Sequence, residues 1–163
     1  MKRIIIHWTA GNYNPNEHEK SCYHFLIDSK GKVYAGTHKP EDNENCNDGN
    51  YAAHTGGGNT GSIGVAMCGM FNYKQGIADS TPYPLTATQF EACMKKVAQL
   101  CKQYNIAITP QTVMTHYEFG IKNPKTTSAG KIDIIYLPHQ PQVTSGEVGN
   151  YIRNKALWYY QRL

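Results

Sequence analysis

Short runs of hydrophobic residues occur near the start of the chain and again near its middle, and each run predicts a strand. Residues 3–6 hold three consecutive isoleucines, a pattern typical of a central strand that is covered on both faces. Residues 23–28 and 33–36 predict two further strands, joined by a hairpin turn at residues 29–32. The apolar run at residues 63–69 predicts another buried strand.

Helical periodicity appears later in the chain. Thr86 and Gln89 form a capping-box pattern that predicts a helix from this point to about residue 103. Its inner face is a stripe of residues at helical spacing, namely Phe90, Cys93, Val97, Cys101 and Tyr104. Residues 145–161 predict a C-terminal helix whose inward residues are Val148, Ile152 and Tyr159.

Polar stretches separate these elements. Residues 12–20 are expected to form a loop or one turn of helix, and residues 39–51 a long surface loop. Strands interleaved with at least two helices predict an α/β fold with a mixed central sheet and helices packed against it. The length of 163 residues, without internal repeats or a linker, indicates one domain over residues 1–163.

Composition narrows the class of protein. Hydrophobic residues make up 40% and charged residues 17%, which is typical of a globular chain rather than a disordered one. The net charge is +4, but no run of five basic residues occurs, so we expect no nucleic-acid partner. No stretch is long and apolar enough for stable membrane insertion.

The cysteines and the N-terminus bear on where the protein is made. The five cysteines form no CxxC pair, which disfavours a structural zinc ribbon and fits synthesis in a reducing cytoplasm. The apolar run after Met1 is too short for a secretory signal peptide. We therefore expect synthesis in the cytoplasm, with release by another agent if the protein acts outside the inner membrane.

Three separated residues suggest a metal site. His7 follows the first predicted strand, where a lone histidine is more often structural than a ligand. His116 and Asp133 lie in two later motifs, and together the three are ligands of the kind that zinc uses when it keeps a position for water. A second candidate, the glycine cluster at residues 53–62, lacks the Gly-Lys-Ser/Thr ending of a phosphate-binding loop and is disfavoured.

Zinc hydrolysis also needs a group that handles protons and a donor for the oxyanion. Lys131 lies two residues before Asp133, so both side chains face the same way if that segment is extended. It is the candidate oxyanion donor. Tyr23, at the start of the second strand, is the candidate to orient water or handle a proton.

Five motifs occur in one order along nearly the whole chain, and this set resembles a known family. The family is the zinc-dependent N-acetylmuramoyl-L-alanine amidases of the second type, which includes phage lysozyme-amidases, a cytosolic anhydro-muropeptide amidase and the animal peptidoglycan recognition proteins. The motifs are Ile-Ile-His7-Trp-Thr-Ala, Tyr23-His24-Phe25-Leu26-Ile27, Ala53-His54 with Asn59 and Ser62-Ile63-Gly64, Thr115-His116-x-Glu118, and Lys131-x-Asp133.

The resemblance implies the fold of that superfamily and a mechanism. One zinc ion per chain would be bound by His7, His116 and Asp133, and would activate water to cleave the amide between N-acetylmuramic acid and L-alanine. Lys131 would stabilise the oxyanion, and Tyr23 would assist the water or the leaving amine. The remaining implied residues line the substrate groove, namely His54 and Asn59.

Several of these residues have a simpler structural interpretation. Tyr23 could be only a groove wall, His54 could only shape its loop, and Asn59 could only cap backbone groups of a turn. His24 should point away from Tyr23 along a strand, so we interpret it as structural. Glu118 either contacts a zinc-ligating histidine from behind or is a surface charge.

The chain also departs from the family pattern. Only fifteen residues separate His7 from Tyr23, so the helix that normally flanks the groove must be short or missing. Asp133 is followed by Ile-Ile-Tyr rather than Pro-Gly, yet the only other carboxylate after His116 in this segment is Glu118. Asp133 therefore stays the expected third ligand.

Three functions fit the resemblance. The first is a lytic amidase, a phage or prophage endolysin that acts on the cell wall after release, as a monomer without a separate wall-binding domain. The second is a cytosolic enzyme that recycles muropeptides. The third is a peptidoglycan-binding module without catalysis, which the retention of Lys131 and Asp133 disfavours.

Overall fold

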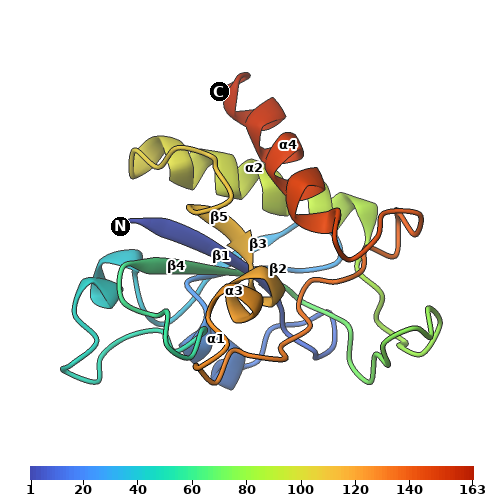
Figure 1. Cartoon of the computed structure of the whole chain (residues 1–163), viewed down its shortest axis with the longest axis horizontal. Helices are drawn as coiled ribbons and strands as arrows, with labels where there is room; N and C mark the ends of the chain where they lie inside the picture. The colour runs from blue at the N-terminus through green and yellow to red at the C-terminus, as the bar shows by residue number, and fades with distance from the viewer.

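The protein is built around one five-stranded sheet, described here from a computed structural model that covers all 163 residues. The strand order is β3-β2-β4-β1-β5 (Figure 1). Strands β2, β4, β1 and β5 run parallel, and only β3 is antiparallel to its neighbour. The mixed sheet predicted from the sequence is confirmed. The strands are β1 (Arg3–Trp8), β2 (Phe25–Ile27), β3 (Val33–Ala35), β4 (Ser62–Met67) and β5 (Val113–Thr115).

Helices cover both faces of this sheet. The two longest, α2 (Ala87–Gln103) and α4 (Val148–Tyr160), pack against each other on one face, while α1 (Glu17–Cys22) lies on the opposite side (Figure 1). Helix α3 (His116–Lys122) follows β5 directly, and a 3-10 helix, η1 (Pro40–Glu44), lies beside β4. No helix of the structure is both long and apolar enough to cross a membrane.

The two faces of the central strands differ in character. Ile4 and Ile6 of β1 belong to the main core with α2 and α4, whereas Ile5 packs in a separate small cluster with Met114 and Phe119. Because side chains alternate along a strand, His7 shares the face of Ile5. The large apolar residues of β4 enter the main core, and its other face carries only Ser62, Gly64 and Ala66. These small residues leave room beside His7 for other side chains.

Most of the predicted elements are present with shifted ends. Thr86 and Gln89 form the expected capping box, and the helix they open ends at Gln103 as predicted. The C-terminal helix starts at Val148, later than expected, and the side chain of its N-cap residue Glu147 does not cap it. Of its expected inward residues Val148 and Ile152 are buried, while Tyr159 is half-buried and donates a hydrogen bond to Glu91.

Four segments differ in detail from the sequence predictions. The strand expected at residues 23–28 is shorter, and the polar residues 39–51 contain η1. The segment between His7 and Tyr23 holds only a short helix, α1, of six residues. Helix α3 was not predicted, and the segment of Lys131 and Asp133 is no strand but an irregular stretch with a turn at Asp133.

The cysteines have no disulfide partners. All five thiols are free. Cys93 and Cys101 are buried on the inner face of α2, as the sequence predicted, and burial raises the pKa of the Cys101 thiol to about 12. These two thiols therefore contribute to the core rather than to chemistry.

Candidate metal centre and its cavity

Three metal-binding side chains meet beside the sheet although they are far apart in the sequence. His7 comes from β1, His116 is the first residue of α3, and Asp133 lies in the turn after Lys131. One ligand atom from each lies within 4.8 Å of the others. Asp133 Oδ2 is 3.0 Å from His7 Nδ1 and 3.3 Å from His116 Nδ1. The structure thus brings together the three residues that the sequence proposed as ligands.

The local structure explains how the candidate ligands His116 and Asp133 are held. Thr115 ends β5 and caps α3, since its hydroxyl accepts from the backbone N–H of Glu118. The backbone N–H of Tyr117 donates to the carbonyl of Asp133. This bond ties the turn that carries Asp133 to the helix that carries His116. The two ligands are therefore fixed relative to each other by the backbone.

Burial and charge make this cluster suited to a cation. All three side chains are buried. Burial alone would raise the pKa of Asp133, but its interactions with His116 and His7 outweigh this effect and hold the pKa below its usual range. Burial lowers the pKa of His7, which favours the neutral imidazole that a metal needs. The cluster is therefore a buried carboxylate beside nitrogen ligands.

The spacing between Asp133 and each histidine fits zinc. With bonds of about 2.0–2.2 Å in a tetrahedral site, two ligand atoms lie roughly 3.4 Å apart. The two contacts of Asp133, at 3.0 and 3.3 Å, are close to that value. Three protein ligands also leave the fourth position of a tetrahedral site free for water or substrate.

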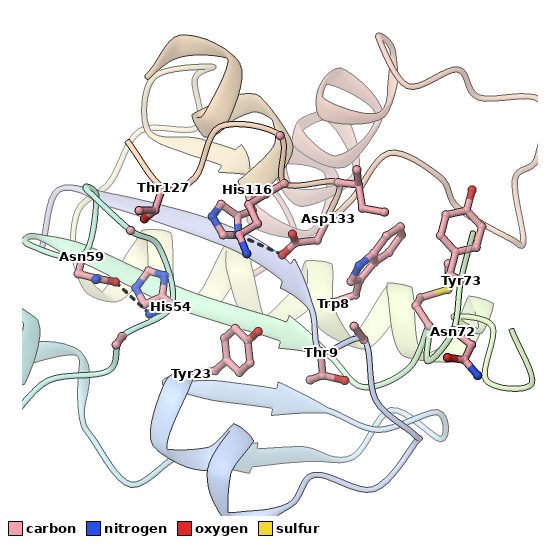
Figure 2. Close-up of a pocket in the computed structure, with 17 residues that line it drawn as sticks. Trp8, Thr9, Tyr23, His54, Asn59, Asn72, Tyr73, His116, Thr127 and Asp133 are labelled. Carbon is pink, nitrogen blue, oxygen red and sulfur yellow. Dashed lines mark hydrogen bonds and ion pairs between the residues drawn. The ribbon is translucent and has the colours of Figure 1, made fainter. Parts of the chain in front are cut away.

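A cavity of about 630 Å³ opens onto this cluster. His116, Asp133 and Tyr23 lie at its middle (Figure 2). One end is lined by His54, Asn59 and Thr127, and the other by Trp8, Asn72 and Tyr73. His7 is fully buried behind these residues and is absent from the lining. The site is thus an elongated groove with the ligand cluster near its centre.

Tyr23 and Lys131 both line the groove. The Tyr23 ring lies 5.1 Å from the ring of His7, and burial together with the charge of Asp133 raises the pKa of its phenol. Tyr23 therefore stays protonated and can donate a hydrogen bond. The side chain of Lys131 is exposed and forms no hydrogen bond or ion pair within the protein. Its ammonium is free to meet a ligand, although the segment is not the extended strand assumed from the sequence.

His54 and Asn59 also line the groove, but their polar atoms are engaged in the protein. His54 Nδ1 lies 2.7 Å from Thr55 Oγ1 and 3.1 Å from His7 Nε2, and His54 Nε2 lies 3.3 Å from the carbonyl oxygen of Ser62. The Asn59 side-chain oxygen accepts from the backbone N–H groups of His54 and Thr55 (Figure 2). Both residues therefore help to organise their loop, and their contact with substrate stays a prediction.

His24 is structural, as expected. Its Nδ1 accepts from the backbone N–H of Gly64 at 2.9 Å, and its Nε2 donates to Asn43 Oδ1 at 2.9 Å. Burial lowers the pKa of His24 from 6.5 to about 4, so the ring is neutral. His24 is absent from the groove lining, whereas its neighbour Tyr23 is part of it.

The suggestion that Glu118 contacts a ligand histidine from behind is wrong. Its carboxylate accepts from Arg153 on α4 and from the backbone N–H of Thr115, and it makes no hydrogen bond with His116. The reason is geometric, since in the first turn of α3 the side chain of Glu118 folds back to complete the capping box. Glu118 is therefore held by an ion pair and a helix cap.

One protein-family model matches most of the chain. The model described as N-acetylmuramoyl-L-alanine amidase matches residues 1–131, well over half of the chain. The chain belongs to this amidase family. The match includes His7 and His116 but ends before Asp133, so the candidacy of Asp133 as a third ligand rests on the geometry above. A search of curated proteins gives no match.

Several solved structures share the fold. PlyL, solved as a point mutant, is 25% identical with a TM-score of 0.52, over 96% of this chain and 84% of PlyL. The amidase LysC from Clostridium intestinale URNW is 19% identical with a TM-score of 0.50, over 77% of this chain and 75% of LysC. AmiD from E. coli, solved with an anhydro-muropeptide substrate, is 17% identical with a TM-score of 0.50, over 71% of this chain and 48% of AmiD.

Several residues around the amidase groove were not found by sequence reasoning. Ser128 is fully buried and bonds to His116, and Thr55 lies beside His7. Trp8 and Tyr73 form an edge-to-face pair at one end of the groove, with ring centres 5.5 Å apart. The polar loops that carry Thr55, Tyr73 and Ser128 have no periodicity, so no local signal indicated these contacts. Helix α3 did have a signal, because Thr115-His-Tyr-Glu118 is a capping-box pattern.

Proposed function

We propose that this chain is a zinc-dependent peptidoglycan hydrolase that cleaves the amide between N-acetylmuramic acid and L-alanine of the stem peptide. The observation that carries the proposal is the buried His7, His116 and Asp133 cluster at the centre of a groove of about 630 Å³. Membership of the amidase family supports the bond that is cleaved. Binding of an anhydro-muropeptide by AmiD supports the class of substrate.

The ligand cluster would hold one zinc ion per chain. A zinc ion bound there would supply Lewis acidity, which makes water nucleophilic near neutral pH and polarises the carbonyl group. The buried carboxylate of Asp133 would offset the positive charge, and the two imidazoles would keep the site selective for a metal with mixed nitrogen and oxygen ligands.

Lys131 and Tyr23 have separate roles in this proposal. As the oxygen of water bonds to the carbonyl carbon, negative charge develops on the carbonyl oxygen, and the free ammonium of Lys131 stabilises it. The C–N bond then breaks, the carbonyl group re-forms as a carboxylic acid, and the leaving nitrogen takes up the proton that the attacking water gives up. Tyr23, whose phenol stays protonated, orients the water or the leaving amine as a hydrogen-bond donor rather than as a proton carrier.

We further propose that the enzyme is lytic and works as a monomer on the intact cell wall after release from the cytoplasm. The open, elongated groove supports a polymeric substrate, and no residue of helix α1 lines it. A recycling enzyme would instead act on small soluble muropeptides. The comparison of rates on intact sacculi and on purified anhydro-muropeptides separates the two roles, because a lytic enzyme should prefer sacculi.

The bond specificity is tested by analysing the products. Sacculi digested with the zinc-loaded protein should release stem peptides with free L-alanine amino termini, seen by mass spectrometry, and leave glycan strands without new reducing ends. New reducing sugar ends would mean a glycosidase and would overturn the proposal. Binding to sacculi without any product would identify a non-catalytic recognition module.

A further inference from the structure

Ser128 contacts the side of His116 that faces away from the ligand cluster. His116 Nε2 lies 3.0 Å from Ser128 Oγ, and Ser128 Oγ lies 2.7 Å from the carbonyl oxygen of Gly56. Ser128 is fully buried, so water does not compete for its hydroxyl. The carbonyl oxygen can only accept, so the hydroxyl proton goes to Gly56. Ser128 Oγ must then accept from His116, which places a proton on His116 Nε2.

His54 contacts Nε2 of His7, as Ser128 contacts Nε2 of His116. His54 Nε2 lies 3.3 Å from the carbonyl oxygen of Ser62, so this nitrogen carries a proton. In a neutral ring His54 Nδ1 is then an acceptor, and the Thr55 hydroxyl donates to it at 2.7 Å. His7 Nε2 lies 3.1 Å from His54 Nδ1 and 3.3 Å from Thr55 Oγ1, so both atoms that face it can accept. Gly64 permits this arrangement, because a Cβ atom there would come within 2.5 Å of the His54 ring. His7 Nε2 is therefore the donor of this contact.

The contacts of Ser128 with His116 and of His54 with His7 have the same consequence for the ligand cluster. A neutral imidazole carries one ring proton, so protons on both Nε2 atoms leave both Nδ1 atoms as lone-pair donors. These are the two atoms that lie 3.0 and 3.3 Å from Asp133 Oδ2. Three acceptors then converge on one point, and only a cation satisfies all of them.

We infer that Ser128 and His54 are positioning residues that fix the Nε2–H tautomers of His116 and His7, so that both bind the metal through Nδ1. The inference rests on the zinc site of the proposed function. It changes the role of His54, which acts on the metal through His7 instead of through substrate. It also gives a role to Ser128, which lies in the Thr/Ser-rich loop 122–130.

The loop that carries Ser128 is built to reach His116. The Ser128 backbone carbonyl packs so closely on Gly120 of α3 that a Cβ atom at Gly120 would clash with it. The backbone N–H of Lys131 donates to the same carbonyl at 3.2 Å. Ser128 is thus fixed by the helix that starts with His116 and by the segment that leads to Asp133.

The affinity for zinc tests the role of Ser128. Competition with a chromogenic chelator should show a zinc Kd about 10- to 100-fold weaker in Ser128→Ala than in the parent, as for other partners of metal-bound histidines. The matched control is Ser145→Ala, since Ser145 is exposed and its side chain makes no hydrogen bond in the structure. Its Kd should stay within about twofold of the parent value, because it lacks such a contact.

The tautomers are tested directly on the unaltered protein. Long-range ¹H–¹⁵N correlation spectra of the zinc-loaded chain should show His7 and His116 bound through Nδ1 with a proton on Nε2. In Ser128→Ala, the Nε2 proton of His116 should exchange faster while that of His7 is unchanged. The spectra of the parent need no variant, so the inference stays testable if Ser128→Ala fails to fold.

The outcomes separate this inference from the proposed function. A parent protein that binds no zinc would overturn the proposed metal site. A parent that binds zinc through Nε2 of His116, or a Ser128→Ala variant with unchanged zinc affinity, would overturn only the positioning role. Zinc bound through both Nδ1 atoms, with affinity lost in Ser128→Ala, supports both.

Discussion

The guanidinium of Arg153 forms a two-pronged ion pair with the carboxylate of Glu118, with both N–O distances at 3.0 Å. Arg153 Nη1 also donates to the carbonyl of Val113 at the start of β5. Because Glu118 caps the first turn of α3, this contact joins the C-terminal helix α4 to the element that begins with His116. The last helix therefore supports the candidate metal centre without contacting it.

The first prediction concerns this pair. Arg153→Ala should lower the free energy of unfolding by roughly 3 kcal/mol, because it leaves a carboxylate of low exposure without its partner. It should also weaken zinc binding, since the start of α3 is then less firmly held. Urea unfolding of the metal-free protein and chelator competition measure the two effects separately.

An exposed ion pair gives the control for this prediction. Lys20 and Glu17 on α1 are 3.5 Å apart, and Glu17 is almost fully exposed. Surface pairs of this kind contribute little to stability, so Lys20→Ala should have a much smaller effect than Arg153→Ala. Equal effects of the two changes would show that the Arg153 contact has no special importance.

The second prediction concerns the third metal ligand. Asp133→Asn keeps the size of the side chain but removes its charge. Zinc affinity should therefore fall by more than about 100-fold, a larger loss than the one expected for Ser128→Ala, which removes only a contact of a ligand histidine. Zinc per chain is measured by elemental analysis after dialysis. In the parent, a chelator should abolish activity and added Zn²⁺ should restore it. Full zinc occupancy in Asp133→Asn would remove Asp133 from the ligand set.

The third prediction separates Lys131 from metal binding. Lys131→Ala should keep its zinc and its binding to sacculi but lose about 100- to 1,000-fold in kcat, because the ammonium acts mainly in the transition state. Lys131→Arg should recover little, since a planar guanidinium does not replace a compact ammonium. The control is Lys125→Ala, an exposed lysine of the same loop outside the groove. A Lys131→Ala enzyme within a few-fold of the parent would contradict the proposed role.

The fourth prediction is a loss of stability in acid that depends on His24. The unfolded chain binds a proton at this residue with a pKa near 6.5, whereas burial lowers the pKa in the folded protein to about 4. The unfolded state therefore takes up the proton first as the pH falls. Between about pH 6.5 and 4 the free energy of unfolding should fall by roughly 3 kcal/mol because of this residue. Below that range His24 should lower it little further.

The measurement for His24 is a difference between two proteins. Urea unfolding of the metal-free parent and of His24→Gln at several pH values should show a steeper loss in the parent below pH 6.5. Burial also lowers the pKa values of His7 and His54, and both residues are present in the two proteins. The charge of His24 contributes to the lowered pKa of His54, so the difference measures His24 together with its coupling to His54. Parallel pH profiles would mean that His24 does not titrate as described.

Much of the scaffold could be predicted from the sequence because its signals are local. The isoleucines of β1 and the capping box of Thr86 and Gln89 depend on neighbouring residues alone. The order of the five motifs likewise pointed to the family and proposed His7, His116 and Asp133 as ligands. The capping box of Thr115 and Glu118 was an equally local signal, so helix α3 was predictable in principle.

Only the tertiary structure decided which groups meet across long separations. Glu118 is paired with Arg153, Ser128 joins His116 to Gly56, and His54 lies against His7 only because Gly64 leaves space. None of these contacts has a periodic or propensity signal, since each depends on how loops pack on the finished sheet. The sequence by itself therefore determined the strands, the main helices and the ligand types, while packing between distant segments determined what orients the ligands.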